Sequence, residues 1–196
     1  MKKQRSDSDL LFEIGSFRHI DRMWKEFGGG QPANDAEHSF RVAWIAWMLA
    51  VRESADVSKC IKMALLHDIA EIRTGDVNYL SHMYADRKEN EAMNDQFSCS
   101  ILSEEVLTLW REYEERKTLE SQIVKDADTL DCDLELMEMK AQGMTLPDAL
   151  WPTRQAARDR IYTKTARAMF EEIYKSDPHS WHANGVNRFT AGDWSK

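Results

Sequence analysis

The stretch LLHDIAEIRTGD, residues 65–76, carries the most specific pattern in this sequence. His67 and Asp68 are adjacent at the end of an apolar run. Glu71 follows His67 by four residues and Asp68 by three, and in a helix this spacing places all three side chains on one face. Burying a histidine and two carboxylates on one face is unfavourable unless a partner satisfies them. A divalent metal is such a partner, because imidazole nitrogen and carboxylate oxygen suit zinc, manganese, iron or cobalt.

A His-Asp pair alone is ambiguous, since a histidine in a helical bundle often caps a helix or pairs with an acid instead of binding metal. Two further segments favour the metal. DAEHSFRVAWIAWMLA (residues 35–50) places His38 at the start of an amphipathic helix. IVKDADTLD (residues 123–131) places Asp128 in another helix with apolar periodicity. Four such residues in this order are much harder to obtain by chance than any one of them.

The rest of the chain also has the pattern of helices. Glycine and proline are scarce, at 8 and 4 residues, which favours helices with few breaks over a sheet-rich fold. We expect Ser58 to cap a helix, a helix break near Ser103, and Pro152 in the first turn of a C-terminal helix. The apolar spacing predicts helical segments over about residues 8–24, 36–53, 58–72, 86–113, 119–142 and 152–175. The fold prediction is therefore one all-α domain over residues 1–196 with an irregular tail at 176–196.

Composition limits the partners and the compartment. Hydrophobic residues make up 42% and charged residues 31%, which is typical of a globular protein. The net charge of −8 argues against a nucleic acid polymer as partner, because such a surface is usually basic. The apolar stretch from Val42 to Val51 is too short to span a bilayer. The three cysteines have no CxxC spacing, so we expect free thiols in a cytoplasmic protein that does not associate with membranes.

The segments AEHSFRVA, ALLHDIAE, TGD and KDADTLD together resemble those of the HD-domain metal-dependent phosphohydrolases. The similarity covers about residues 10–145. It is greatest to the branch that contains bacterial 5′-deoxynucleotidases and the archaeal and eukaryotic relatives of oxetanocin-type phosphohydrolases. The resemblance implies an HD-type helical bundle that binds one divalent ion (Co, Mn, Zn, Fe or Mg). The implied metal ligands are His38, His67, Asp68 and Asp128.

The same resemblance implies roles for residues around the metal. Glu71 would hold or activate the attacking water, and Asp76 would assist near the substrate. An arginine closely followed by a tryptophan contacts phosphate and sugar in that branch, and HIDRMWKEF matches it with Arg22 and Trp24, although Met23 intervenes. The loop after Asp76 contacts substrate and often carries proline in the family. Here that loop reads Val77, Asn78 and Tyr79.

Several charged and aromatic residues have ordinary structural interpretations. The acids flanking Asp128 are more typical of a solvated face or of ion pairs than of ligands; they are Asp126, Asp131 and Asp133. Four arginines have the spacing of a solvated helix face, although one could reach a triphosphate or a neighbouring subunit; they are Arg154, Arg158, Arg160 and Arg167. We expect Trp44 and Trp47 to lie in the core or at an interface rather than to stack on a nucleotide base. Seven tryptophans and ten methionines favour a homodimer or higher homo-oligomer.

Three functions fit this pattern. We expect first a 5′-nucleotidase that releases phosphate from (deoxy)nucleoside 5′-monophosphates. The alternatives are a deoxynucleoside triphosphate phosphohydrolase with the same metal site and a catalytically silent nucleotide-binding module. The intact ligand set and Glu71 favour an enzyme. Guanosine tetraphosphate hydrolases of the superfamily carry a Glu-Asp pair where this chain has Glu71-Ile72, and the GYP signature of cyclic-di-GMP phosphodiesterases is missing from the sequence.

Overall fold

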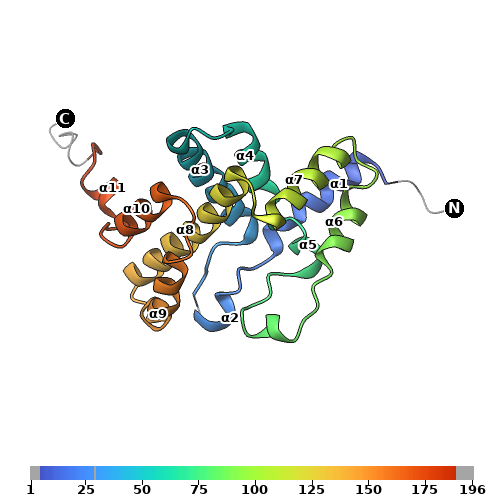
Figure 1. Cartoon of the computed structure of the whole chain (residues 1–196). Helices are drawn as coiled ribbons and strands as arrows, with labels where there is room; N and C mark the ends of the chain where they lie inside the picture. The colour runs from blue at the N-terminus through green and yellow to red at the C-terminus, as the bar shows by residue number, and fades with distance from the viewer. Residues whose placement is uncertain (1–4, 29, 189–196) are drawn as a thin grey trace.

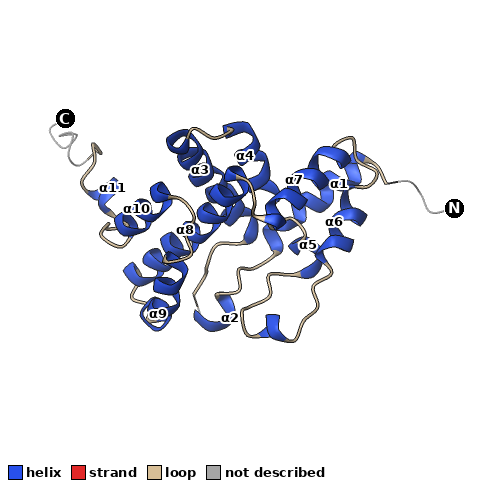
Figure 2. Ribbon diagram, viewed as in Figure 1, coloured by secondary structure: helices blue, strands red, loops and turns tan. Residues whose placement is uncertain are grey.

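The computed structural model describes residues 5–28 and 30–188, and within these residues the chain is all helical (Figure 1). Figure 2 shows helices joined by loops in this part of the chain. The predicted fold class is confirmed. None of the helices in the described residues has the length and apolar character needed to cross a membrane.

The main core is formed by α3 (Asp35–Glu53), α4 (Val57–Leu66), α7 (Ser103–Glu115), α8 (Leu119–Ala141) and α10 (Lys164–Ile173). α3 begins at the N-cap Asn34 and ends at Ser54, which adopts a left-handed conformation. Its apolar residues recur every three or four positions and are buried: Val42, Ile45, Ala46, Leu49 and Ala50. The helix therefore presents one face to α4 and α8, and the helix predicted over residues 36–53 is confirmed.

A second apolar cluster joins the N-terminal segments to the middle of the chain. It brings together α1 (Asp7–Gly15), the 3₁₀ helix η1 (Ser16–His19), α6 (Glu89–Phe97), α7 and the segment around α5 (Glu71–Thr74). Two short elements complete this region, α2 (Lys25–Gly28) and the 3₁₀ helix η2 (Ser81–Met83). This packing holds the residues around Arg22 and Asp76 beside the main core.

The helix predicted over residues 58–72 is shorter than expected. Asp56, not Ser58, caps α4 by accepting a hydrogen bond from the amide of Lys59. α4 ends at Leu66, and a tight turn follows in which the amide of Ile69 donates to the carbonyl of Leu66. The segment predicted over 86–113 is two helices, α6 and α7, and the break expected near Ser103 is confirmed, since α7 begins at that residue.

The single C-terminal helix predicted over residues 152–175 is wrong. The structure has α9 (Leu146–Arg158), with Pro147 in its first turn and Pro152 inside it, and then α10. The connection is held because the buried carboxylate of Asp126 accepts hydrogen bonds from the amides of Tyr162 and Thr163. The expected irregular tail contains the short helix α11 (Ser180–Ala183), and residues 189–196 lie outside the described part.

Candidate metal centre

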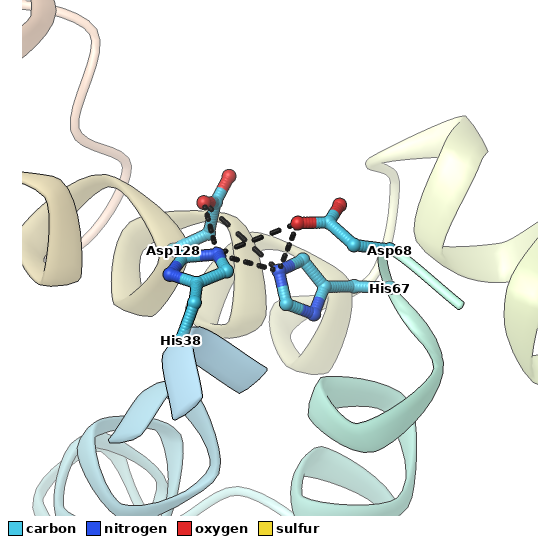
Figure 3. Close-up of side chains that lie close together, drawn as sticks. All are labelled: His38, His67, Asp68 and Asp128. Atoms are coloured by element: carbon cyan, nitrogen blue, oxygen red, sulfur yellow. Dashed lines mark hydrogen bonds and ion pairs between the residues drawn. The ribbon is translucent and has the colours of Figure 1, made fainter. Parts of the chain in front are cut away.

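Four side chains from separate parts of the chain meet at one point (Figure 3). They are His38 in the first turn of α3, His67 and Asp68 just after α4, and Asp128 in the middle of α8. Their ligand atoms all lie within 4.8 Å of one another. His38 Nε2 lies 3.2 Å from His67 Nε2, 3.4 Å from Asp68 Oδ2 and 3.3 Å from Asp128 Oδ1. Two imidazole nitrogens and two carboxylates thus surround one small space.

The local structure directs both histidines inward. The capping box of Asn34 and Glu37 fixes the first turn of α3, which carries His38. His67 Nδ1 lies 2.7 Å from the carbonyl oxygen of Ala64, which can only accept a hydrogen bond. Nδ1 therefore donates this hydrogen bond, and Nε2 faces the other ligand atoms.

The turn after α4 changes how Glu71 is placed. We expected His67, Asp68 and Glu71 on one face of a continuous helix. Instead the helix ends before His67, and Glu71 begins the separate short helix α5. The turn lets the adjacent His67 and Asp68 side chains meet, with His67 Nε2 3.1 Å from Asp68 Oδ2.

The charges of the four residues depend on one another. Burial raises the pKa of Asp128, but the ammonium of Lys125 at 2.7 Å and the nearby His38 outweigh it and hold the pKa well below its usual range. Burial also raises the pKa of Asp68, and the two histidines reverse this. Burial and Arg22 lower the pKa of His38, yet hydrogen bonds to carboxylates, Asp128 first, raise it overall. The centre is thus arranged to hold positive charge between ionised carboxylates.

A buried carboxylate orients His38 from behind. Asp131 Oδ2 lies 2.6 Å from His38 Nδ1, and the guanidinium of Arg41 donates to the other oxygen of Asp131. We expected Asp131 to be solvated or ion-paired; it is ion-paired and fully buried. The sequence carried a signal for this placement, because Asp128 and Asp131 are three residues apart and share a face of α8.

The other two flanking acids are also buried rather than solvated. Asp133 accepts two hydrogen bonds from the guanidinium of Arg154, at 2.7 and 2.8 Å, and one from the hydroxyl of Tyr174. Asp126 anchors the loop before α10. The solvated arginine face that we expected is therefore wrong for Arg154, whose side chain is largely buried. Residues 21 to 41 positions apart on separate elements of a bundle cannot be paired from spacing alone, so these contacts were missed.

A second group of carboxylates adjoins the first and surrounds Arg22. Carboxylate oxygens of Asp35, Glu71 and Asp76 lie within 4.8 Å of one another. The Nη1 atom of the buried Arg22 lies 3.5 Å from Asp76, 3.7 Å from Asp35 and 3.8 Å from Asp68. This arginine therefore links the second group to the four residues of the first group, which we call the metal-type cluster: His38, His67, Asp68 and Asp128.

Glu71 and Asp35 each lie beside an arginine, but some of their buried carboxylate oxygens have no hydrogen-bond partner among the described residues. Glu71 Oε1 accepts a hydrogen bond from Arg87 at 2.8 Å, while its Oε2 has no partner among the described residues. Burial and the charges of Asp68 and Asp76 raise the pKa of Glu71 to about 11. Burial and Asp76 raise the pKa of Asp35 to about 7. Buried carboxylates with raised pKa values and unpartnered oxygens fit a site that takes up a divalent cation.

Asp76, Trp24 and Val77, which we predicted to lie near the substrate, differ in their surroundings. Asp76 accepts a hydrogen bond from the amide of Met23 at 2.9 Å, which fixes the loop that carries Arg22. Trp24 is buried against Leu136 and Met139. The loop residue Val77 is half-buried.

Two further loop residues contact α2. Asn78 donates to Glu26 and accepts from the amides of Leu80 and Ser81, so it shapes the loop. The exposed Tyr79 stacks on Phe27 with ring centroids 5.4 Å apart. Arg87, which the sequence did not single out, donates a hydrogen bond to Glu71.

A cavity of about 650 Å³ lies between α8, α9 and the start of the α10 connection. Its wall includes three cationic side chains, Lys125, Arg154 and Arg160, together with Thr129 and Tyr162. Lys125 connects this wall to the metal-type cluster, since its ammonium contacts Asp128. Arg154 is held rigidly by Asp133. The cavity is therefore suited to an anionic group next to the cluster.

Comparisons with known proteins agree with this geometry. A family model described as HD domain matches residues 14–174. The 5′-deoxynucleotidase HDDC2 of Xenopus laevis is 31% identical over 131 residues, which are 64% of this chain and 65% of that protein. The chain thus spans about two thirds of the length of that curated relative.

Solved structures share the fold. A conserved hypothetical protein from Pyrococcus furiosus matches with a TM-score of 0.73 and 28% identity, over 86% of this chain and 99% of that chain. A predicted metal-dependent phosphohydrolase from Magnetospirillum magnetotacticum MS-1 matches with a TM-score of 0.68 and 27% identity, over 86% of this chain and 91% of that chain. The likeness extends well beyond the four clustered residues.

Proposed function

The chain belongs to the HD domain family, as its motifs predicted, and from this membership we propose that it is a 5′-nucleotidase for (deoxy)nucleoside monophosphates. The observation that carries the proposal is the meeting of His38, His67, Asp68 and Asp128 directly beside Arg22 and Glu71. Relatives named 5′-deoxynucleotidase support the choice of substrate class. We propose that the four clustered residues hold one divalent ion.

The carboxylates and the arginine have separate roles in this proposal. When bound, the ion supplies Lewis acidity at a phosphoryl oxygen and lowers the pKa of water. Glu71 would orient the attacking water through its unpartnered Oε2 atom while Arg87 fixes its Oε1. The raised pKa of Glu71 would fall beside a bound divalent ion, so that its carboxylate could accept the proton of the water. Arg22 offers its planar donors to the phosphoryl oxygens as negative charge redistributes during transfer.

The surroundings position these groups. Asp76 fixes the backbone at Met23 and, with Asp68 and Asp35, limits the positions that the Arg22 guanidinium can take. We propose that the side of the site formed by Trp24 and residues 77–79 contacts the sugar and base. The three free cysteines are consistent with a cytoplasmic location, which we also propose.

A second candidate activity is hydrolysis of deoxynucleoside triphosphates. The cavity lined by Lys125, Arg154 and Arg160 favours it, because its cations suit further phosphates and one of them, Lys125, contacts Asp128. Arg160 forms no ion pair within residues 5–28 and 30–188, so no internal ion pair has to break before it binds a phosphate.

Phosphate release from a panel of ribo- and deoxynucleoside mono- and triphosphates tests the proposal. The assay is run with EDTA and then with added Mn, Co, Zn or Mg, and the nucleoside products are identified. We expect single phosphate release from monophosphates, restored by metal and lost in His67→Ala. Release only from triphosphates, reduced in Arg160→Ala, would favour the second candidate. Nucleotide and metal binding without hydrolysis would mean that the chain is a silent binding module.

A further inference from the structure

The chain leaves α7 through a residue with an unfavourable backbone conformation. Arg116 ends this helix with φ 53° and ψ 26°, in the left-handed region. Glycine adopts this conformation freely and is the usual residue where a helix ends in this way, whereas a Cβ atom makes it unfavourable. Among residues 5–28 and 30–188, Ser54 at the end of α3 is the other non-glycine residue with a positive φ. An arginine therefore occupies a position at which glycine would suit the turn better.

The side chain of Arg116 lies over an aromatic ring. Its guanidinium carbon is 3.2 Å from the centroid of the Tyr113 ring, which is a cation–π arrangement. Its Nη1 atom is buried and has no hydrogen-bond partner among the described residues. Its Nη2 atom lies 3.7 Å from the carboxylate of Glu114, in a pair that is partly exposed. The buried part of this cation therefore rests on the Tyr113 ring.

Tyr113 extends this contact to the proposed metal centre. Its ring is buried in the main core and meets the His67 ring at 80°, with centroids 5.8 Å apart. α7 packs against α4, and His67 directly follows α4. The hydrogen bond from Nδ1 to the carbonyl of Ala64 holds one atom of the His67 ring, so the ring can still tilt about that contact. The Tyr113 ring is packed beside it and limits this tilt.

We propose that Arg116 is a positioning residue for His67 and that it acts through Tyr113. The guanidinium covers one face of the Tyr113 ring and so holds the ring against His67. His67 points its Nε2 atom toward the other three ligand side chains, and metal affinity depends on how such a ring is held (Figure 3). The inference rests on the proposed function, in which His67 binds a divalent ion. The unfavourable backbone conformation of Arg116 is the cost of placing a cation on that ring.

The charge of Arg116 by itself predicts the opposite effect on metal binding. A cation near the centre disfavours the uptake of a divalent ion, so its removal would strengthen metal binding if charge were decisive. If Arg116 served the turn alone, glycine at this position would leave metal binding unchanged. Weaker metal binding after the loss of this cation is therefore the result that positioning predicts and the other two roles do not.

Two glycine variants test the proposal. Arg116→Gly and Ser54→Gly make the same backbone change, each at the left-handed end of a helix, and Ser54 lies at the opposite end of α3 from His38. We expect Arg116→Gly to bind Mn²⁺ or Zn²⁺ about 10-fold more weakly than the wild type, the lower end of the cost of losing a contact that orients a ligand. Ser54→Gly should bind metal like the wild type. Competition with a chelating dye measures the affinities, and urea unfolding checks that both variants are folded.

A conservative variant tests whether the cation on the ring is what matters. Arg116→Lys keeps a positive charge that can reach the Tyr113 ring and keeps the left-handed backbone of a non-glycine residue. We expect its metal affinity to lie within about threefold of the wild type. An Arg116→Lys variant that binds metal as weakly as Arg116→Gly would contradict the role of the cation.

The ring of His67 can also be followed without metal. Long-range proton–nitrogen NMR spectra of the metal-free protein record its ring signals, which His67→Ala identifies by their absence. We expect these signals to move in Arg116→Gly and to stay in place in Ser54→Gly, because the Tyr113 ring shifts the resonances of nuclei beside it. If the wild type bound no metal and the His67 signals moved in Arg116→Gly alone, the proposed function would fail while the contact from Arg116 to His67 would be supported.

Three results would overturn the inference. Metal binding by Arg116→Gly that equals or exceeds that of the wild type would mean that Arg116 does not position His67. His67 signals that stay in place in Arg116→Gly would show that the contact through Tyr113 does not reach the histidine. Equal losses of metal affinity in Arg116→Gly and Ser54→Gly would assign the effect to the backbone change instead of the cation.

Discussion

His38 Nδ1 lies 2.6 Å from Asp131 Oδ2, and both side chains are buried. Burial raises the pKa of Asp131 less than His38 and Arg41 lower it, so its carboxylate is ionised and can only accept. Asp131 therefore accepts a hydrogen bond from His38 Nδ1–H. The contact fixes the ring and leaves Nε2 to face His67, Asp68 and Asp128. One buried acid thus determines how a proposed metal ligand is presented.

We expect Asp131→Asn to weaken metal binding by about 10–100-fold, the usual cost of removing such an orienting partner. The amide keeps the shape of the side chain but can present its NH₂ group to His38 and disturb the tautomer. Isothermal titration with Mn²⁺ or Zn²⁺ measures the affinity. Glu138→Gln is the matched control, because Glu138 contacts Arg41 at the surface without reaching His38. Equal affinities in both variants would contradict the orienting role of Asp131.

Glu71→Gln should separate chemistry from metal binding. If Glu71 accepts a proton from the attacking water, we expect kcat to fall by about 10²–10⁴-fold. The glutamine keeps the volume and the contact with Arg87, so the metal content should stay at the wild-type level. Phosphate release and metal analysis of the same sample measure both quantities. Full activity with metal bound would show that another group performs this role.

The cluster itself could be anticipated from sequence because each ligand lies in a segment with clear helical periodicity. His38 begins an amphipathic helix, and Asp128 lies on the same face of α8 as buried apolar residues. The fold class followed from the same periodicity and from the few glycines and prolines. These patterns depend only on residues that are close in sequence, so they can be recognised without knowledge of the tertiary structure.

The features that were missed depend on tertiary contacts. No glycine or proline marks the end of α4 at Leu66, because the turn is stabilised by the contacts of His67 and Asp68 with distant side chains. The pairs Arg41–Asp131 and Arg154–Asp133 join different helices, and the pair Arg87–Glu71 joins the loop before α6 to α5. Which carboxylate meets which arginine is decided by helix packing, and spacing within one helix carries no information about it.

Arg22→Ala should impair substrate use and leave the metal in place. The guanidinium lies near Asp35, Asp68 and Asp76, so its removal adds net negative charge beside the cluster and does not weaken cation binding. We expect kcat/KM to fall about 10–100-fold, the equivalent of one charged hydrogen-bonding group. Steady-state kinetics and metal titration measure the two effects. Lys25→Ala is the control, because the ion pair that Lys25 forms among the described residues is with the exposed Asp21. Loss of metal in Arg22→Ala would contradict this separation.

The cap of α3 links helix stability to the proposed metal centre. Asn34 accepts a hydrogen bond from the amide of Glu37, one residue before His38. We expect Asn34→Ala to lower the free energy of unfolding by about 1 kcal/mol and also to weaken metal binding, because the first turn frays. Ser6→Ala removes the similar capping box of α1, far from the cluster in sequence. It should cost comparable stability at unchanged metal affinity. Equal metal affinities in the two variants would count against the link.

The buried thiol of Cys60 should make the chain sensitive to alkaline pH. Cys60 is fully buried in the main core, and burial, with smaller contributions from Glu120 and Asp56, raises its pKa from 9.0 to about 12. The folded state therefore favours the protonated thiol more than the unfolded state does. This stabilisation is fully present below about pH 9 and is lost as the pH rises toward 12. In the upper part of that window the loss approaches about 1.4 kcal/mol per pH unit.

Urea unfolding of the wild type and Cys60→Ala at several pH values from 8 upward measures this effect. At pH 8 the variant should be less stable, because it lacks the buried sulfur. As the pH rises above 9, the wild type should lose stability faster, so that the two free energies of unfolding converge. The exposed Cys99 is common to both proteins and cancels in the difference. Parallel curves over the whole range would mean that the thiol of Cys60 ionises in the folded protein as easily as in the unfolded chain.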